Sequence, residues 1–150
     1  MKTTGVTFKH HPNGMLTEDI FYIKAEELNP LKEGEILVKN SDLSVDPYMR
    51  AKMASISGIG YSIPNELMPG DSVGEVVESK HPGYKVGDTV CHRIGLRTLS
   101  TVVPDHSVYK VPDSSGDNKR YLSILGFPAR GAFTSATKIL NLEEGKTLSI

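Results

Sequence analysis

The pentapeptide Asp-Pro-Tyr-Met-Arg at residues 46–50 carries the clearest chemical information in the sequence. It follows a strand-like run at 35–39, and Pro47 suits the first position of a helix because it lacks the N–H group that stays unpaired there. Asp46 is predicted to cap that helix. The bend would present residues 48–50 together. The Tyr48 phenol keeps its proton at neutral pH and can donate a hydrogen bond to a carbonyl group.

Each of these side chains also has an ordinary structural explanation. Tyr48 can pack its ring against the core and hold its hydroxyl in water. Met49 is the type of residue that fills irregular core space. Arg50 can attract a negatively charged ligand or simply be solvated or paired. Tyr61 lies in a glycine-rich stretch that we interpret as a loop at the rim of a cleft, where it either touches a ligand or is a surface residue.

Length and composition limit the classes of function. The 150 residues fit one ordinary domain. A net charge of −1 gives no basic patch for nucleic acid and no attraction to an anionic membrane. No apolar stretch approaches the ~18 residues of a membrane span. Cys91 is the only cysteine, so an internal disulfide is impossible, and we expect a reducing compartment, the cytoplasm.

Turn-forming residues divide the chain into short β-rich runs, which predicts a mainly β domain built as a small barrel or sandwich. A short helix is expected at 120–125, and a second is expected from Pro128 to Leu140, followed by the start of a strand at 147–150. The expected strands are Thr3–Phe8, Asp19–Glu26, Glu35–Val45, Ser72–Ser79, Asp88–Ile94, Thr98–Val103 and Ser107–Val111.

The pentapeptide and the Val-Gly-Asp-Thr-Val run at 86–90 together resemble the zinc-independent medium-chain reductases, the group of prostaglandin reductases, leukotriene B4 dehydrogenases and plant double-bond reductases. The resemblance implies a GroES-like, partly open β-barrel over residues 1–125. Residues 126–150 would then hold a crossover helix and the first strand of a Rossmann domain that binds the dinucleotide. We therefore expect the chain to be the front part of a longer protein.

The resemblance also implies site residues, although it assigns no catalytic residue. Tyr48, Arg50 and Tyr61 would contact substrate, and Pro47, Phe127 and Gly131 would lie against the cofactor. Two departures from the family stand out. The stretch Gly-Leu-Arg-Thr-Leu at 95–99 lacks the family's aromatic residue and contains a cation. Gly131 stands where the family has a threonine whose hydroxyl helps to position the cofactor.

No metal site is expected. Zinc-dependent relatives place a cysteine near residues 44–46 and a Gly-His-Glu run at 70–72, and both are missing here. Cys91 and His92 are neighbours on an expected strand, so their side chains point to opposite faces. His10, His11, His81 and His106 are interpreted as loop or surface residues.

The implied activity is that of an NADPH-dependent oxidoreductase which reduces the C=C bond of α,β-unsaturated carbonyl compounds. The partner would be a small-molecule enone or quinone, and the intact protein would be a homodimer. Residues 1–150 alone are expected to be inactive. Two alternatives stay open: a zinc-free quinone oxidoreductase, and a non-catalytic, stand-alone GroES-like binding module. The expected apolar face of the second helix, near Phe133 and Leu140, speaks against the stand-alone module because it requires a partner.

Overall fold

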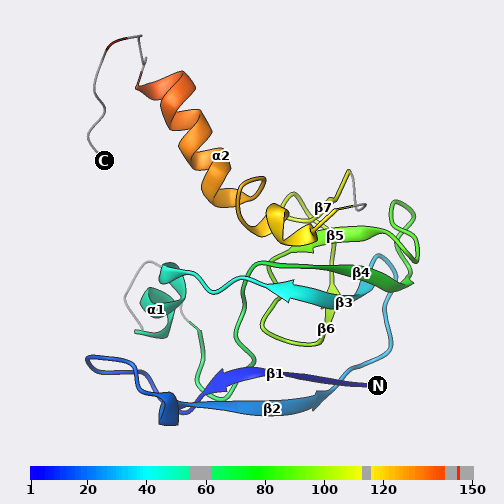
Figure 1. The fold of residues 1–150 in the computed structure, drawn as a ribbon. Coiled ribbons are helices and arrows are strands. Elements are labelled where there is room, and N and C mark those ends of the chain that lie inside the picture. Colours follow the sequence, from blue (N-terminus) through cyan, green and yellow to red (C-terminus); the bar gives the residue numbers. More distant parts are fainter. Residues whose placement is uncertain (55–61, 113–115, 141–144, 146–150) are drawn as a thin grey trace.

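The computed structural model describes residues 1–54, 62–112, 116–140 and 145. Within these residues the chain forms two antiparallel sheets with short helices beside them (Figure 1). The first sheet pairs β1 with β2, and the second has the order β6-β3-β4-β5-β7. The strands are β1 (Lys2–Phe8), β2 (Phe21–Glu27), β3 (Ile36–Leu43), β4 (Ser72–Ser79), β5 (Thr89–His92), β6 (Leu99–Val102) and β7 (Tyr109–Lys110).

In the described part of the chain, β1 meets the second sheet along β6 and the residues just before it. Gly5 of β1 forms an isolated antiparallel bridge with Arg97, and the backbone N–H of Val6 donates to the carbonyl of Leu96 at 2.9 Å. A Cβ atom at Gly5 would lie 2.6 Å from the Leu96 carbonyl oxygen, so this approach requires glycine. The barrel is therefore partly open, as the sequence predicts.

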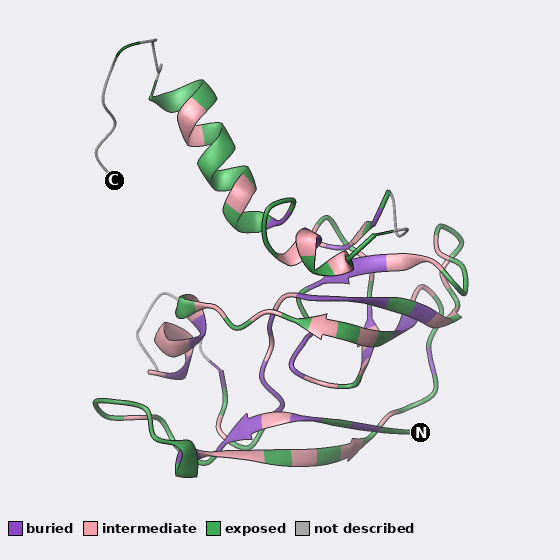
Figure 2. Ribbon diagram, viewed as in Figure 1, coloured by how far each residue is buried: buried purple, intermediate pink, exposed green. Residues whose placement is uncertain are grey.

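Three clusters of buried side chains form the core (Figure 2). The first fills the space between the β1–β2 sheet and α1 (Pro47–Met53) and includes Phe8 and Ile20. The second lies on one face of the five-stranded sheet, around Ile36 and Val76. The third lies around Val73 and Cys91, where the 3₁₀ helix Asn118–Leu122 contributes Tyr121.

A buried polar network ties β3, β5 and β6 together. The ring of His92 is 2% exposed, and its Nε2 lies 2.8 Å from the Asn40 Oδ1 atom. Its Nδ1 accepts a hydrogen bond from the Ile94 backbone N–H, so the Nε2 atom carries the proton and donates to Asn40. Asn40 in turn donates to the Ser100 hydroxyl oxygen at 2.9 Å. The network is thus fully paired with His92 neutral.

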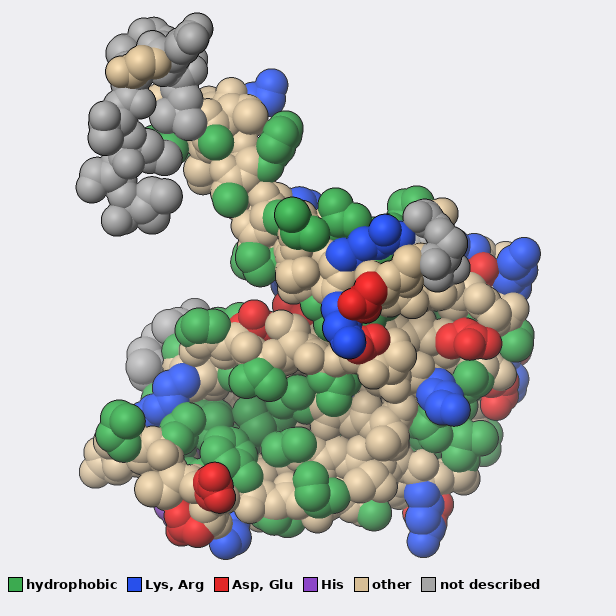
Figure 3. Space-filling view, in the orientation of Figure 1, with side chains coloured by type: hydrophobic (Ala, Val, Ile, Leu, Met, Phe, Trp, Pro, Cys, Tyr) green, Lys and Arg blue, Asp and Glu red, His purple; other side chains and the backbone are tan. Residues whose placement is uncertain are grey.

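The helix α2 (Phe127–Thr134) continues as a π-helical segment, Ser135–Ile139, and projects away from the sheets (Figure 1). Neither segment contains a buried residue. Phe133 and Ile139 are 68% and 71% exposed, and Figure 3 shows hydrophobic side chains along this helix. The helix predicted from Pro128 to Leu140 is confirmed, whereas the strand predicted at 147–150 lies outside the described residues.

The remaining expectations about elements hold, with shifts at their ends. The strand expected from Asp19 begins at Phe21, because Glu18–Ile20 forms a 3₁₀ turn. The strand expected to reach Val45 ends at Leu43. The helix expected at 120–125 is the 3₁₀ helix Asn118–Leu122. In the described part of the chain, no helix has the length and apolar character that a membrane span requires.

The neutral state of His92 predicts a dependence of stability on pH. Burial, with Arg97 nearby, lowers the pKa of His92 to about 4 from 6.5. Above pH 6.5 both folded and unfolded chains hold it neutral. As the pH falls from 6.5 toward 4, only the unfolded chain takes up the proton, so the free energy of unfolding falls by up to ~1.4 kcal/mol per pH unit. Urea titrations at several pH values measure this loss.

The variant His92→Gln is the matched control, since an amide can still donate to Asn40 but does not titrate. The loss between pH 6.5 and 4 should be about 3 kcal/mol larger in the parent protein than in this variant. Equal losses in the two proteins would show that His92 takes up its proton in the folded state.

Candidate functional site

Helix α1 is fixed by two methionine side chains. Met49 and Met53 are 5% and 1% exposed, and their i, i+4 spacing places both on the face that meets the first core cluster. Pro47 occupies the first turn, as predicted. A Cβ atom at Gly70 would lie 2.7 Å from the Met49 Cε atom, so the residues before β4 pass very close to this helix. The helix therefore has one buried face, and Tyr48 lies beside that face.

The capping role predicted for Asp46 is wrong. Asp46 occupies the N-cap position with extended backbone angles, but its side chain makes no capping hydrogen bond. Its backbone carbonyl accepts from the Met49 N–H at 3.0 Å instead. The Oδ2 atom of Asp46 is buried without a hydrogen-bond partner in the described part of the chain. Asp46 thus begins the helix through its backbone and not through its carboxylate.

A cleft of about 830 Å³ separates α1 and the ends of β4 and β5 from the base of α2. Its walls come from six separate segments of the chain. The lining residues are Asp46, Pro47, Tyr48, Asp71, Ser72, Cys91, His92, Arg93, His106, Ser107, Tyr109, Tyr121, Leu122, Phe127, Pro128, Arg130, Gly131, Thr134, Ser135 and Ile139.

An ion pair lies on the floor of this cleft. The Nε atom of Arg93 lies 3.2 Å from the Asp71 Oδ1 atom, and the guanidinium lies 5.4 Å from the centre of the Phe127 ring. Burial raises the pKa of Asp71, while Arg93 opposes that rise and Asp46 adds to it. The register explains the pairing. Because Ser72 pairs with His92, Asp71 and Arg93 stand opposite each other one residue further along.

Tyr48 is half-buried, with its ring 5.2 Å below the Lys52 Nζ atom. Burial raises the pKa of Tyr48, and the carboxylates of Asp71 and Asp46 raise it further, whereas Arg93 lowers it. The phenol therefore keeps its proton at neutral pH and is available as a hydrogen-bond donor. Its ring also packs on the first core cluster, as the structural explanation expects, while its contact with substrate stays a prediction.

A second tyrosine lines the opposite wall. Burial raises the pKa of Tyr109, and contact with the Cys91 thiol adds to the rise. The Tyr109 hydroxyl lies 3.5 Å from the Tyr121 carbonyl oxygen, and the guanidinium of Arg130 lies 5.7 Å from the centre of the Tyr109 ring. Arg130 is thus held over an aromatic ring at the cleft, in the same way as Arg93.

The structure brings four of the six predicted site residues into one cleft: Pro47 and Tyr48 from α1, and Phe127 and Gly131 from α2. Arg50 lies apart, because its Nη2 atom donates to the Gly14 carbonyl at 2.8 Å and it does not line the cleft. Its contact with substrate stays a prediction. Tyr61 lies outside the described residues.

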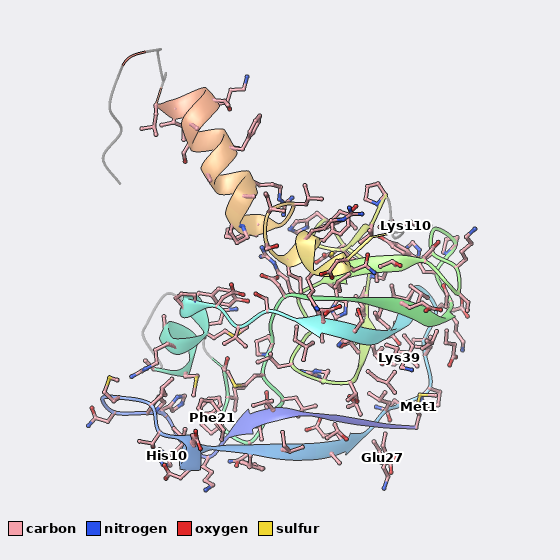
Figure 4. The ribbon with its side chains drawn as sticks, in the orientation of Figure 1. Met1, His10, Phe21, Glu27, Lys39 and Lys110 are labelled. Carbon is pink, nitrogen blue, oxygen red and sulfur yellow. The ribbon has the colours of Figure 1, made fainter. Side chains whose placement is uncertain are left out.

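The cation noted at 95–99 does not face the cleft. Arg97 donates to the carbonyl oxygens of Leu67 and Gly95, and Leu96 turns into the first core cluster with a φ of 56°. Asp71, Arg93 and Arg130 also line the cleft, and no sequence pattern singled them out as site residues. His106 is exposed in a turn, as expected, and it lines the cleft as well. By contrast, His10 lies near the turn end of the β1–β2 sheet (Figure 4).

The side chains of Cys91 and His92 do lie on opposite faces. Cys91 packs with the third core cluster, while His92 belongs to the polar network with Asn40. In the described part of the chain, no three or more His, Cys, Asp or Glu side chains come together as they would around a metal ion.

Sequence comparison places the chain in a known group. A family described as the N-terminal domain of oxidoreductase matches residues 5–111. The chain belongs to this family.

Three similar proteins extend the match. The 2-alkenal reductase (NADP(+)-dependent) of Nicotiana tabacum is 29% identical over 150 residues, which are 97% of this chain and 44% of that protein. The NADPH-dependent curcumin reductase of Escherichia coli (strain K12) is 32% identical over 142 residues, which are 93% and 40%. The crystal structure of CurA in complex with NADPH from Vibrio vulnificus superimposes with a TM-score of 0.85 at 23% identity, covering 95% of this chain and 42% of that one.

These matches confirm the resemblance to the double-bond reductase group and the GroES-like fold. The chain spans less than half the length of these relatives. The described cleft therefore corresponds to a part of proteins that are more than twice as long.

The burial of Cys91 predicts that its thiol reacts slowly with thiol reagents. The side chain is 4% exposed, and burial raises the pKa of its thiol, so little thiolate is accessible for attack. Modification by a disulfide reagent at pH 8 should be about 100-fold slower in the native protein than in denaturant. A matched control is Val45→Cys in a Cys91→Ala background, since position 45 is 84% exposed and should react at nearly the unfolded rate. If native Cys91 reacts as fast as this control, the Tyr109 wall does not cover it.

Proposed function

We propose that the chain is the front part of an NADPH-dependent oxidoreductase that reduces the C=C bond of α,β-unsaturated carbonyl compounds. Residues 1–125 form its substrate domain, and residues 126–150 lead to a domain that binds the dinucleotide. The single observation that carries the proposal is the cleft that unites Tyr48 of α1 with Phe127 and Gly131 of α2. The names of the similar reductases supply the reaction class.

The residues present fit the nicotinamide end of the cofactor. The cleft volume of about 830 Å³ lies within the usual range of ligand sites. Gly131 faces open space, with no atom within 4 Å of a Cβ placed there, so the base of α2 leaves room beside Phe127 and Pro47. When bound, NADPH supplies the hydride that adds to the β-carbon of the substrate.

The chain itself supplies orientation and charge stabilisation. Negative charge collects on the carbonyl oxygen as the β-carbon is reduced, and a hydrogen bond that strengthens in that state lowers the barrier. Tyr48 donates this bond, because its phenol is protonated and half-buried at the cleft. Phe127, Leu122 and Ile139 give the cleft apolar walls against which the carbon skeleton of the substrate packs. A proton from solvent completes the reduction at the α-carbon.

The proposal extends to the setting of the enzyme. We propose a zinc-independent site, because the cysteine and histidine that zinc-dependent relatives have near residues 46 and 71 are replaced here by Asp46 and Asp71. Asp71 forms an ion pair with Arg93 instead. We also propose a cytoplasmic homodimer without nucleic-acid or membrane partners. The free, buried Cys91 supports the compartment, and the net charge of −1 supports the absence of nucleic-acid and membrane partners.

The proposed function predicts that the Tyr48 hydroxyl contributes to the rate of enone reduction. In the complete protein, Tyr48→Phe should lower kcat for a simple enone by about 10²-fold, because one donor to the developing oxyanion is lost. NADPH oxidation at 340 nm measures the rate. The matched control is Tyr22→Phe, which removes a hydroxyl that bonds Asn65 on the β1–β2 sheet. It should keep the rate within about twofold.

Two results would contradict the proposal. One is a complete protein that reduces quinones but no enone, which would favour the zinc-free quinone oxidoreductase. The other is turnover of NADPH and enone by residues 1–150 alone, since the proposal places most of the cofactor site outside this chain.

A further inference from the structure

Arg93 is a charged residue of the cleft that is exposed and also held in place by two neighbouring side chains. Its side chain is 55% exposed, yet Asp71 contacts its Nε atom and the Phe127 ring lies 5.4 Å from its Cζ atom. In the described part of the chain its two Nη groups have no hydrogen-bond acceptor. A guanidinium held along one edge and over one face is preorganised to offer its remaining donors to a ligand.

The neighbouring charged residues of the cleft leave the Nη groups of Arg93 accessible to a ligand. Asp71 is only 22% exposed at its side chain and lies behind Arg93, while the Oδ2 atom of Asp46 is buried. Arg130 is exposed and lies over the Tyr109 ring on the opposite wall. Arg93 is therefore more exposed than the carboxylate that it pairs with, so its guanidinium is the more accessible partner for a ligand in the cleft.

We propose that Arg93 is a specificity-determining residue that binds a carboxylate of the substrate. The preferred substrates are then enones that carry a carboxylate, rather than neutral enones. Arginine pairs with carboxylates through two parallel N–H···O bonds, which adds orientation as well as affinity. The inference rests on the proposed function, because Tyr48 holds the carbonyl oxygen while Arg93 holds the carboxylate of the same molecule.

Arg93 and Tyr48 lie near each other in the cleft, which favours a short substrate. Both side chains lie beside Asp71, and both line the same cleft. A molecule that reaches both therefore carries its carboxylate within a few bonds of its carbonyl group. The pair 4-oxopent-2-enoate and its methyl ester meets this description: the ester replaces the negative charge by a neutral group on the same carbon skeleton, and the change of the acid-to-ester ratio on mutation reports the contribution of Arg93.

The kinetic test uses the complete protein with both substrates. The acid should have a kcat/KM at least about tenfold above that of the ester, mainly through KM. Arg93→Gln should remove this preference, because it should raise KM for the acid at least about tenfold more than KM for the ester. Arg93→Lys keeps the positive charge but cannot donate two parallel hydrogen bonds, so it should retain only part of the preference for the acid. Lys39→Gln, a cation on β3 outside the cleft, is the matched control.

A cofactor phosphate is the other possible source of an anion, and the same assay separates the two. If Arg93→Gln raises the KM for NADPH equally with acid and ester, the group it binds belongs to the cofactor and the proposal is overturned. An acid-to-ester ratio that is the same in the parent protein and in Arg93→Gln also overturns it. In both cases reduction of the ester still stands as evidence for the proposed function.

A binding experiment on residues 1–150 tests the inference without turnover. Titration with 4-oxopentanoate should shift the Arg93 side-chain Nε–H signal in an NMR spectrum, whereas methyl 4-oxopentanoate should shift it far less. Arg93→Gln should abolish the response of the Phe127 ring signals to the acid. Equal shifts with acid and ester, or no shift at Arg93, would overturn the inference even if the complete protein reduces no enone and the proposed function has failed.

Discussion

The burial of Met49 and Met53 is the constraint on which the rest of the site depends. These side chains hold α1 against the first core cluster, and truncation of a buried methionine typically costs 2–5 kcal/mol. Because both lie on one helical face, the neighbouring Tyr48 is forced to the boundary between core and cleft. The Ser44 N–H then donates to the Asp71 carbonyl at 2.8 Å, which ties the residues before α1 to those before β4. Packing and backbone pairing together set the position of the phenol.

The cleft combines this rigid side with a much less enclosed one. The sheets supply Tyr48, Asp71 and Arg93 from elements with buried partners, whereas α2 has no buried residue and contributes Phe127 through its contact with Arg93. A cleft walled on one side by a helix without buried residues encloses less of a ligand than the usual binding site does. This geometry agrees with the proposal that a second domain covers the apolar face of α2 and completes the cofactor site.

Much of the fold could be predicted from sequence because glycine and proline mark nearly every strand end. Local signals failed where tertiary packing decides. Asp46 is a residue type that often caps the start of a helix, yet its carboxylate makes no capping hydrogen bond here. Arg97 looks like a change in the substrate wall, but it bonds backbone carbonyls near Leu96, which enters the core. The Asp71–Arg93 pair depends on the register of β4 against β5, which composition and turn signals do not fix.

The most direct test of the central claim is a crystal structure of the complete protein with NADP⁺ and a saturated ketone product. The account predicts the nicotinamide against Phe127 and Gly131, and the ketone oxygen within about 2.6–3.2 Å of the Tyr48 hydroxyl. A ketone bound away from α1, or a Tyr48 hydroxyl turned from the ligand while the ketone oxygen is held by other groups, would contradict it.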